Sequence, residues 1–366
     1  MLRKIFLGGP LLSKGLLRSI ATISSILYAL LYLKAGSFLP EFVFRDSDKI
    51  QSQIGGSSTY QNTSFDAVAK FYSSLGQTGT TIFVVLIGAV LIFTMVGYSK
   101  RLGALMVNMF LLAPCVFFNL FVASKDTLVV LIALLLVAAA QRWSAWKVAM
   151  VAAILYVGYA TTVRTYFLLI LAVAVAAWLF RAASLRGRMI IALILLIGLF
   201  ALPSQAYYAL LHPRDMAVDY LVAGSPFGAR TGFYNLLPPE SFASFCADYL
   251  YAVMKLHVPV LFFPGPKELV MTCLMGIILV AIFRRTPGSS SDKAGTIEIL
   301  ACLVIGHMAV SMLFEPDLGS YTRHLTSVVV FAAWRLSTLF PERVRQPTFH
   351  GAGAVAIKQA ARNQSA

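Results

Sequence analysis

Uncharged apolar runs of roughly 15 to 23 residues recur along this chain, and they limit the folds that it can adopt. Examples are "TTIFVVLIGAVLIFTMVG" and "MIIALILLIGLFALPSQAYYALL". These runs lack the strict alternation of apolar and polar residues that the strands of a membrane barrel require. Helices then remain as the spanning structure, because they satisfy their own backbone hydrogen bonds in lipid. We therefore expect an all-α, polytopic integral membrane protein.

About ten segments have this character, within a range of about 8 to 12. The composition agrees, because 59% of the residues are hydrophobic and the mean hydropathy is +0.79. We expect residues 1–345 to form one transmembrane domain, and the polar, basic segment 346–366 to be a disordered cytoplasmic tail. The predicted spans are 19–35, 80–98, 103–122, 127–141, 148–163, 166–181, 189–211, 268–283, 297–314 and 324–340.

Lysine and arginine give the orientation. With both termini in the cytoplasm, most of the 30 basic residues fall in short cytoplasmic connections and most of the 15 acids fall outside. The two long loops, at about 36–79 and 212–267, then lie on the external side. We attribute the net charge of +15 to this topology and to contact with membrane lipids, and we expect no nucleic-acid partner.

Candidate catalytic residues gather on the predicted external side. Asp46 and Asp48 flank a serine in the first loop, where they could hold a divalent cation or supply a base, or form only a solvated turn. In "FEPDLGSYTRH" we expect His324, or a carboxylate such as Asp317, to take a proton from an incoming hydroxyl. The alternative is a simple ion pair between Asp317 and Arg323.

Candidate binding residues lie on the same side. Lys125 and Asp126 are adjacent at the mouth of two spans, and Arg164 stands in a minimal turn between two apolar segments. An arginine there, or at position 323, suits carbonyls, acids or phosphate oxygens. Arg214 and Arg230 in the second long loop are further candidates for a polyanionic or polyhydroxylated ligand. In the first loop, Phe65, Val68, Ala69 and Tyr72 have helical spacing and predict an amphipathic, packed helix on the membrane surface.

Three short patterns carry a family resemblance. Ser124-Lys125-Asp126 before a span, Arg164-Thr165-Tyr166 some forty residues later, and Arg323-His324 entering the last span resemble bacterial O-antigen and exopolysaccharide polymerases and their GT-C glycosyltransferase relatives. The resemblance implies that Arg164 and Arg323, with Arg230 in reserve, hold the pyrophosphate of an undecaprenyl-linked sugar donor. This chain departs from the family in its main external loop, which is short and has no Arg-rich repeat. Polymerase, ligase and single-sugar transferase therefore stay open.

The expected function is a glycosyltransferase of the bacterial inner membrane that polymerises undecaprenyl-diphosphate-linked oligosaccharide repeats on the periplasmic face. Its partners would be that lipid-linked substrate and other polysaccharide assembly or export proteins. No cofactor is required, although a divalent cation at Asp46 and Asp48 is compatible. One alternative is a GT-C transferase with a polyprenyl-phosphate sugar donor. Another is a transporter or flippase, which needs charges inside the spans, and apart from Arg335, Glu298 and His307 the span interiors offer very few.

Overall fold

The computed structural model describes residues 1–39, 43–61, 63–223, 230–284 and 292–340. Within these ranges the regular elements are helices, and strand-like pairing is limited to one backbone bridge between Leu11 and Arg101. The elements are α1 (Leu2–Phe6), α2 (Lys14–Phe38), α3 (Arg45–Ile54), α4 (Ser64–Gly97), α5 (Leu102–Cys115), the π-helix η2 (Val116–Leu120), α6 (Lys125–Arg142), α7 (Ala145–Thr162), α8 (Phe167–Ala182), α9 (Leu185–Phe200), α10 (Ser204–Ala223), α11 (Phe242–His257), the 3-10 helix η3 (Pro259–Leu261), α12 (Pro266–Phe283), α13 (Asp292–Phe314), α14 (Leu318–Thr326) and α15 (Val329–Leu339).

Six described helices are long and apolar enough to cross a membrane, namely α2, α4, α5 with η2, α7, α12 and α13. A seventh span is added if α9 and α10 count as one broken helix. The predicted all-α, multi-pass class is confirmed to that extent. Helices cover the other predicted spans as well, but α8 and α15 are shorter apolar helices.

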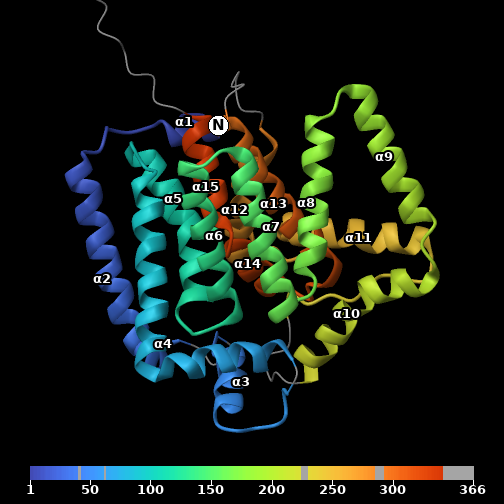
Figure 1. The fold of residues 1–366 in the computed structure, drawn as a ribbon, viewed down its shortest axis with the longest axis horizontal. Helices are drawn as coiled ribbons and strands as arrows, with labels where there is room; N and C mark the ends of the chain where they lie inside the picture. The colour runs from blue at the N-terminus through green and yellow to red at the C-terminus, as the bar shows by residue number, and fades with distance from the viewer. Residues whose placement is uncertain (40–42, 62, 224–229, 285–291, 341–366) are drawn as a thin grey trace, which may run out of the picture.

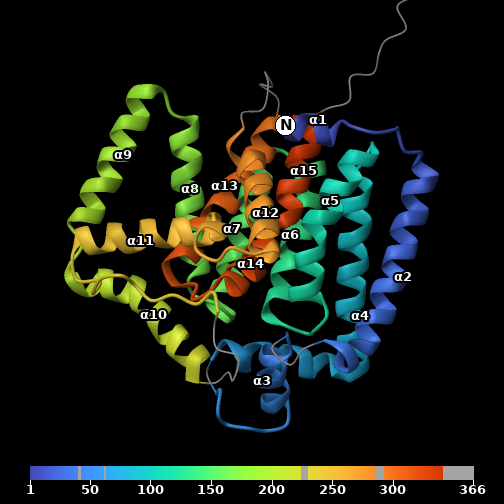
Figure 2. The same cartoon turned by 180° about the vertical axis from the view of Figure 1, so that it is seen from behind.

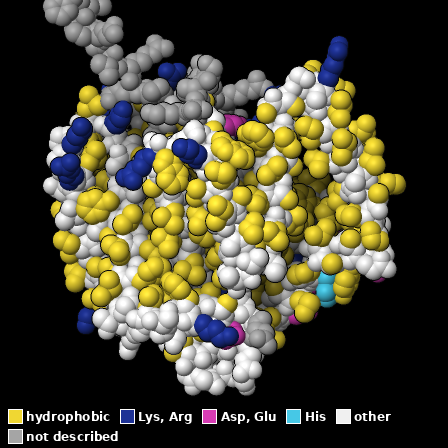
Figure 3. Space-filling model, viewed as in Figure 1, with side chains coloured by type: hydrophobic (Ala, Val, Ile, Leu, Met, Phe, Trp, Pro, Cys, Tyr) yellow, Lys and Arg dark blue, Asp and Glu magenta, His cyan; other side chains and the backbone are white. Residues whose placement is uncertain are grey.

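The bundle has two ends, which Figures 1 and 2 show from opposite sides. The α1 face carries α1, the connection from α8 to α9 and the end of α15, whereas the α3 face carries α3. Lys and Arg side chains gather toward the α1 face in Figure 3, and hydrophobic side chains cover the middle of the visible surface. The predicted tail, 346–366, lies outside the described residues.

One predicted span, 189–211, is wrong as a straight helix. α9 ends at Phe200, α10 begins at Ser204 after Pro203, and the two axes are bent by 90°. A proline lacks the backbone N–H and disfavours helix in the residue before it, which explains the break. Beyond it, α10 turns toward the α3 face, and α11 lies crosswise to α13 in both ribbon views (Figures 1 and 2).

The first loop predicted from sequence is largely helical. α4 bends at Gly76, whose φ of 66° suits glycine and strains other residues. Before this bend, α4 buries Val68, Ala69 and Tyr72, with Phe65 packed against the same cluster. The helical spacing expected in this segment is therefore confirmed as a packing face, and Ile50 of α3 belongs to the same buried cluster.

Gly88 of α4 offers a test of the packing between α2 and α4. A Cβ at this position would lie 2.3 Å from a ring carbon of Tyr28, whose hydroxyl donates to the Leu120 carbonyl at 2.7 Å. We expect Gly88→Ala to destabilise the fold by about 1–3 kcal/mol, because the ring has to move. Thermal unfolding in detergent measures this, with Gly276→Ala, where a Cβ meets nothing within 4 Å, as the control. Equal melting temperatures for the two variants would refute the expectation.

Candidate functional site

Polar side chains from segments far apart in the sequence meet toward the α3 face of the bundle. They come from α3, the start of α6, the connection between α7 and α8, the residue after α13, and α14. Most of them were singled out from the sequence. The central cluster consists of Asp46, Lys125, Asp126, Arg164, Glu315, Arg323 and His324.

Asp126 stands at the middle of this central cluster. Nη1 of Arg164 donates to its Oδ1 at 2.8 Å, and Nε of Arg323 lies 3.3 Å from its Oδ2. Nε2 of His324 lies 3.7 Å from Oδ1. The side chain of Asp126 is only 1% exposed, and a buried carboxylate is very costly unless it is paired. Asp126 therefore anchors both arginines that the resemblance singles out.

Asp46 ties α3 to the central cluster. Its Oδ2 accepts a hydrogen bond from Nη1 of Arg323 at 2.8 Å. Burial raises the pKa of Asp46, but Arg323 and Lys125 outweigh burial and hold the pKa below its ordinary value. Asp48 lies two residues further along the same helix and is exposed. Residues at that spacing do not face each other on a helix, so the two carboxylates do not form one chelating pair here.

No group of three His, Cys, Asp or Glu side chains that could hold a metal ion occurs among the described residues. The carboxylates of the central cluster are instead engaged with arginine and histidine. The arrangement therefore resembles a charge-balanced ion network rather than a ligand set.

Lys125 adds a further cation at the edge of the cluster. It is 6% exposed, and its Nζ donates to Oγ of Ser64 at 3.2 Å and stands 3.4 Å from the centroid of the Phe65 ring. Lys49 approaches the same ring at 5.0 Å and the ring of Tyr220 at 4.5 Å. Cation–π contacts thus connect α3, α4, α6 and α10 beside the cluster.

A carboxylate orients the histidine. Nδ1 of His324 and Oε1 of Glu315 form a hydrogen bond, and both side chains are largely buried. Burial raises the pKa of Glu315, but His324 and Ser320 outweigh burial and leave the pKa below its ordinary value. When Nδ1 donates to Glu315, the lone pair of the neutral ring lies on Nε2. That atom is buried, has no hydrogen-bond partner among the described residues and lies 3.7 Å from Oδ1 of Asp126. A base at this position would accept a proton at Nε2.

The remaining predicted site residues form contacts outside the central cluster. Asp317 caps the start of α14, where its Oδ1 accepts from the backbone N–H groups of Gly319 and Ser320 at 2.6 and 3.0 Å. Burial raises the pKa of Asp317. The alternative ion pair between Asp317 and Arg323 is therefore wrong, since Arg323 pairs with Asp46 and Asp126.

The two arginines of the second loop are also placed elsewhere. Arg214 is fully buried in α10 and donates to Oδ1 of Asn235 at 2.8 Å and to the backbone carbonyls of Met312 and Leu313 at the end of α13. Arg230 pairs with Glu268 at the start of α12, and its side chain is 70% exposed. Among the described residues, neither arginine forms a hydrogen bond or ion pair with the central cluster, although Arg214 is close enough to interact electrostatically with Glu315.

Uncharged residues that the sequence analysis did not single out hold the backbone of the cluster. Asn119, in η2, donates to the carbonyl of Arg323 at 3.0 Å, and Thr127 donates to the carbonyl of Asn119 at 2.8 Å. Tyr159 donates to the carbonyl of Lys125 at 3.1 Å. π-Helical turns are often found at functional sites, and Pro114 just before η2 is the signal in the sequence that could have pointed to one.

Comparison with protein-family models, curated proteins and solved structures finds no match to this chain. The functional argument therefore rests on the chemistry of the central cluster.

The pKa directions of Asp46 and Glu315 predict acid sensitivity. Both folded-state values lie below the ordinary values of 3.8 and 4.5, so their stabilising effect is complete above those values and is lost as the pH falls through the lower folded values. We expect the melting temperature in detergent to fall as the pH is lowered below about 4.5, and to fall less steeply in Asp46→Asn. The exposed Glu240→Gln should follow the wild type. An unchanged slope in Asp46→Asn would contradict the prediction.

Proposed function

We propose that this chain is a bacterial inner-membrane glycosyltransferase of cell-surface polysaccharide assembly, with about ten spans in a GT-C-like arrangement and its site on the external side. In this proposal it polymerises oligosaccharide repeats that are carried on undecaprenyl diphosphate. The observation that carries the proposal is the meeting of Arg323, Arg164 and Lys125 with the Glu315–His324 pair at one end of an apolar bundle.

Arg323 is the more accessible of the two arginines in the proposed diphosphate site. Its side chain is 27% exposed, against 9% for Arg164. A guanidinium fork matches phosphate oxygens, and Asp46 already occupies this fork as an anion. A diphosphate would compete with Asp46 for Arg323, while Arg164 and Lys125 supply further positive charge from behind. Asp126 keeps both arginines in position.

The Glu315–His324 pair supplies the base in the proposed reaction. The acceptor hydroxyl attacks the anomeric carbon from the side opposite the diphosphate, with inversion. The new bond forms as the bond from that carbon to the phosphate oxygen breaks, and the electron pair leaves with the diphosphate. Nε2 of His324 takes the hydroxyl proton, and Glu315 stabilises the imidazolium that forms. A diphosphate leaves readily once its charge is compensated, so this scheme requires no cofactor.

A GT-C transferase that uses a polyprenyl-phosphate sugar donor would employ the same residues on a monophosphate leaving group. The two glycosyltransferase alternatives therefore differ in donor and product length rather than in the roles of Arg323 and His324.

A transporter or flippase of lipid-linked sugars is the second candidate, and one observation favours it. Glu298, in α13, pairs with Arg181 of α8 and with Arg335 of α15, the latter at 2.9 Å. Ion pairs thus join these helices toward the α1 face, while Asp126 joins neighbouring segments toward the α3 face. Alternating access needs contacts that can close each end in turn.

Turnover of purified undecaprenyl diphosphate oligosaccharide tests the enzyme proposal. We expect a product ladder from the wild type and a loss of at least about a hundredfold in Arg323→Ala and Arg164→Ala, since each removes charge stabilisation of the leaving group. Arg186→Ala, exposed at the start of α9, is the matched control and should keep the ladder. Melting temperatures verify that the variants fold.

Two outcomes would overturn this proposal. A ladder that persists in both folded cluster variants removes the arginine mechanism. No turnover by the wild type, combined with lipid flipping in vesicles that Glu298→Gln abolishes, would establish the transporter instead.

Glu315 provides a separate prediction. Because it orients His324, we expect Glu315→Gln to lower kcat by about ten- to a hundredfold with little change in KM, and His324→Ala to lower kcat at least as much. Steady-state rates against acceptor concentration measure both parameters. A rise in KM at unchanged kcat would assign Glu315 to substrate binding and remove its positioning role.

A further inference from the structure

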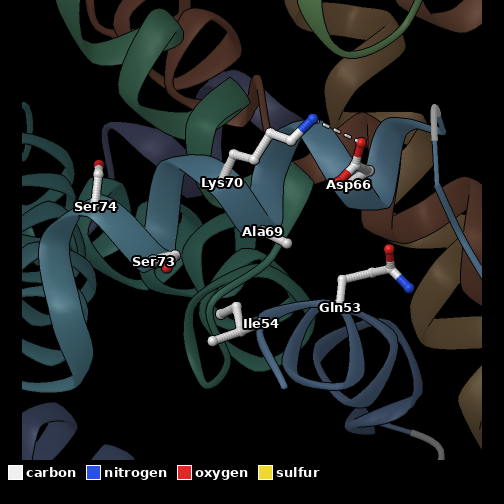
Figure 4. A pocket seen from close by; sticks show the side chains of 7 residues that line it. All are labelled: Gln53, Ile54, Asp66, Ala69, Lys70, Ser73 and Ser74. Atoms are coloured by element: carbon white, nitrogen blue, oxygen red, sulfur yellow. Dashed lines mark hydrogen bonds and ion pairs between the residues drawn. The ribbon is translucent and has the colours of Figure 1, made fainter. Parts of the chain in front are cut away.

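A pocket of about 410 Å³ lies on the α3 face, between α3 and the part of α4 that precedes Gly76. Figure 4 shows that α4 contributes Asp66, Lys70, Ser73 and Ser74, and that Gln53 comes from α3 on the other side. None of these residues belongs to the central cluster. The proposed chemistry therefore leaves this pocket without an assigned role.

The polar lining is neutral overall. Nζ of Lys70 and Oδ2 of Asp66 form an ion pair of 3.0 Å along one side of α4, so their charges compensate each other. The other polar groups are the hydroxyls of Ser73 and Ser74 and the amide of Gln53. A lining of this kind offers donors and acceptors without a net charge, which suits a polyhydroxylated, neutral ligand better than an anion.

One polar atom of the lining lacks a partner. Nε2 of Gln53 is buried and has no hydrogen-bond partner among the described residues. Leaving a buried donor unmade is costly, so an acceptor oxygen of a ligand would satisfy it. Ile54 and Ala69 add an apolar surface to the same pocket, against which the C–H face of a sugar ring can pack.

The pocket is aligned with the central cluster along α3. Gln53 follows Asp46 by seven residues, so the two side chains leave the helix on nearly the same side, about 10 Å apart along its axis. A short oligosaccharide can span such a distance.

We propose that the pocket between α3 and α4 binds a neutral sugar residue of the acceptor glycan, beyond the residue whose hydroxyl reacts. This inference rests on the proposed glycosyltransferase function and names the acceptor subsite. The amide of Gln53 and the hydroxyls of Ser73 and Ser74 bind the sugar hydroxyls, and the Asp66–Lys70 pair keeps the pocket neutral.

The test measures glycan binding by the full chain in detergent, with an array of neutral and acidic bacterial oligosaccharides and with no lipid-linked donor. We expect the wild type to retain neutral glycans. Gln53→Ala should weaken that binding about tenfold through the lost hydrogen bonds, and Ser73→Trp should abolish it by filling the pocket. Gln51→Ala, an exposed glutamine on the same helix, is the matched control and should bind like the wild type.

The inference is overturned if the wild type retains no neutral glycan, or if Gln53→Ala and Ser73→Trp, with wild-type melting temperatures, bind as well as the control. The binding test needs no donor. If the protein binds glycans but has no transferase activity, the binding site in the pocket is supported and the proposed function is refuted. Polymerisation at the wild-type rate by both variants would support the proposed function and remove the pocket as its acceptor subsite.

Discussion

The buried carboxylate of Asp126 is the interaction on which the arrangement of the α3 face depends. A charge with 1% exposure at the end of an apolar bundle requires partners, and Arg164 and Arg323 provide them from segments far away in the sequence. These pairs fix the connection between α7 and α8 and the position of α14 relative to α6. Removing Asp126 would leave the buried Arg164 without this anion and would leave Arg323 with Asp46 alone, so the role of Asp126 in stability and its role in the site cannot be separated.

Much of this site was predictable, because charged residues are costly beside membrane spans and therefore stand out in the sequence. Lys125, Asp126, Arg164, Arg323 and His324 stood out from the sequence as charges beside apolar runs, and basic residues at the other ends of those runs put them on one side. The structure brings them together. The same reasoning predicted the helical class. Neither that class nor the side of the membrane on which the charged residues lie depends on the details of tertiary packing.

The sequence could not predict which charged residues pair with each other or in which direction each side chain points. Asp317 was a reasonable partner for Arg323 by spacing, but its carboxylate accepts from the first N–H groups of α14. The first N–H groups of any helix lack partners within the helix and need an acceptor such as this one. Asp46 and Asp48 could have held a cation together, but both lie in α3 at a spacing of two residues, so their side chains leave the helix on different sides. Asn119 and Tyr159 gave no charge signal, because they act on backbone carbonyls whose positions only the fold defines.

Helix α3 connects the two halves of the proposed reaction. It carries Asp46, which occupies Arg323, and Gln53, which lines the pocket, on nearly the same side. A diphosphate that takes over the fork of Arg323 would release Asp46, the contact that holds this short helix to α14. The wall of the proposed acceptor pocket would then be free to adjust while the donor is bound. In the proposed reaction, donor and acceptor binding would therefore be coupled through the Asp46–Arg323 ion pair, because both sites use side chains of α3.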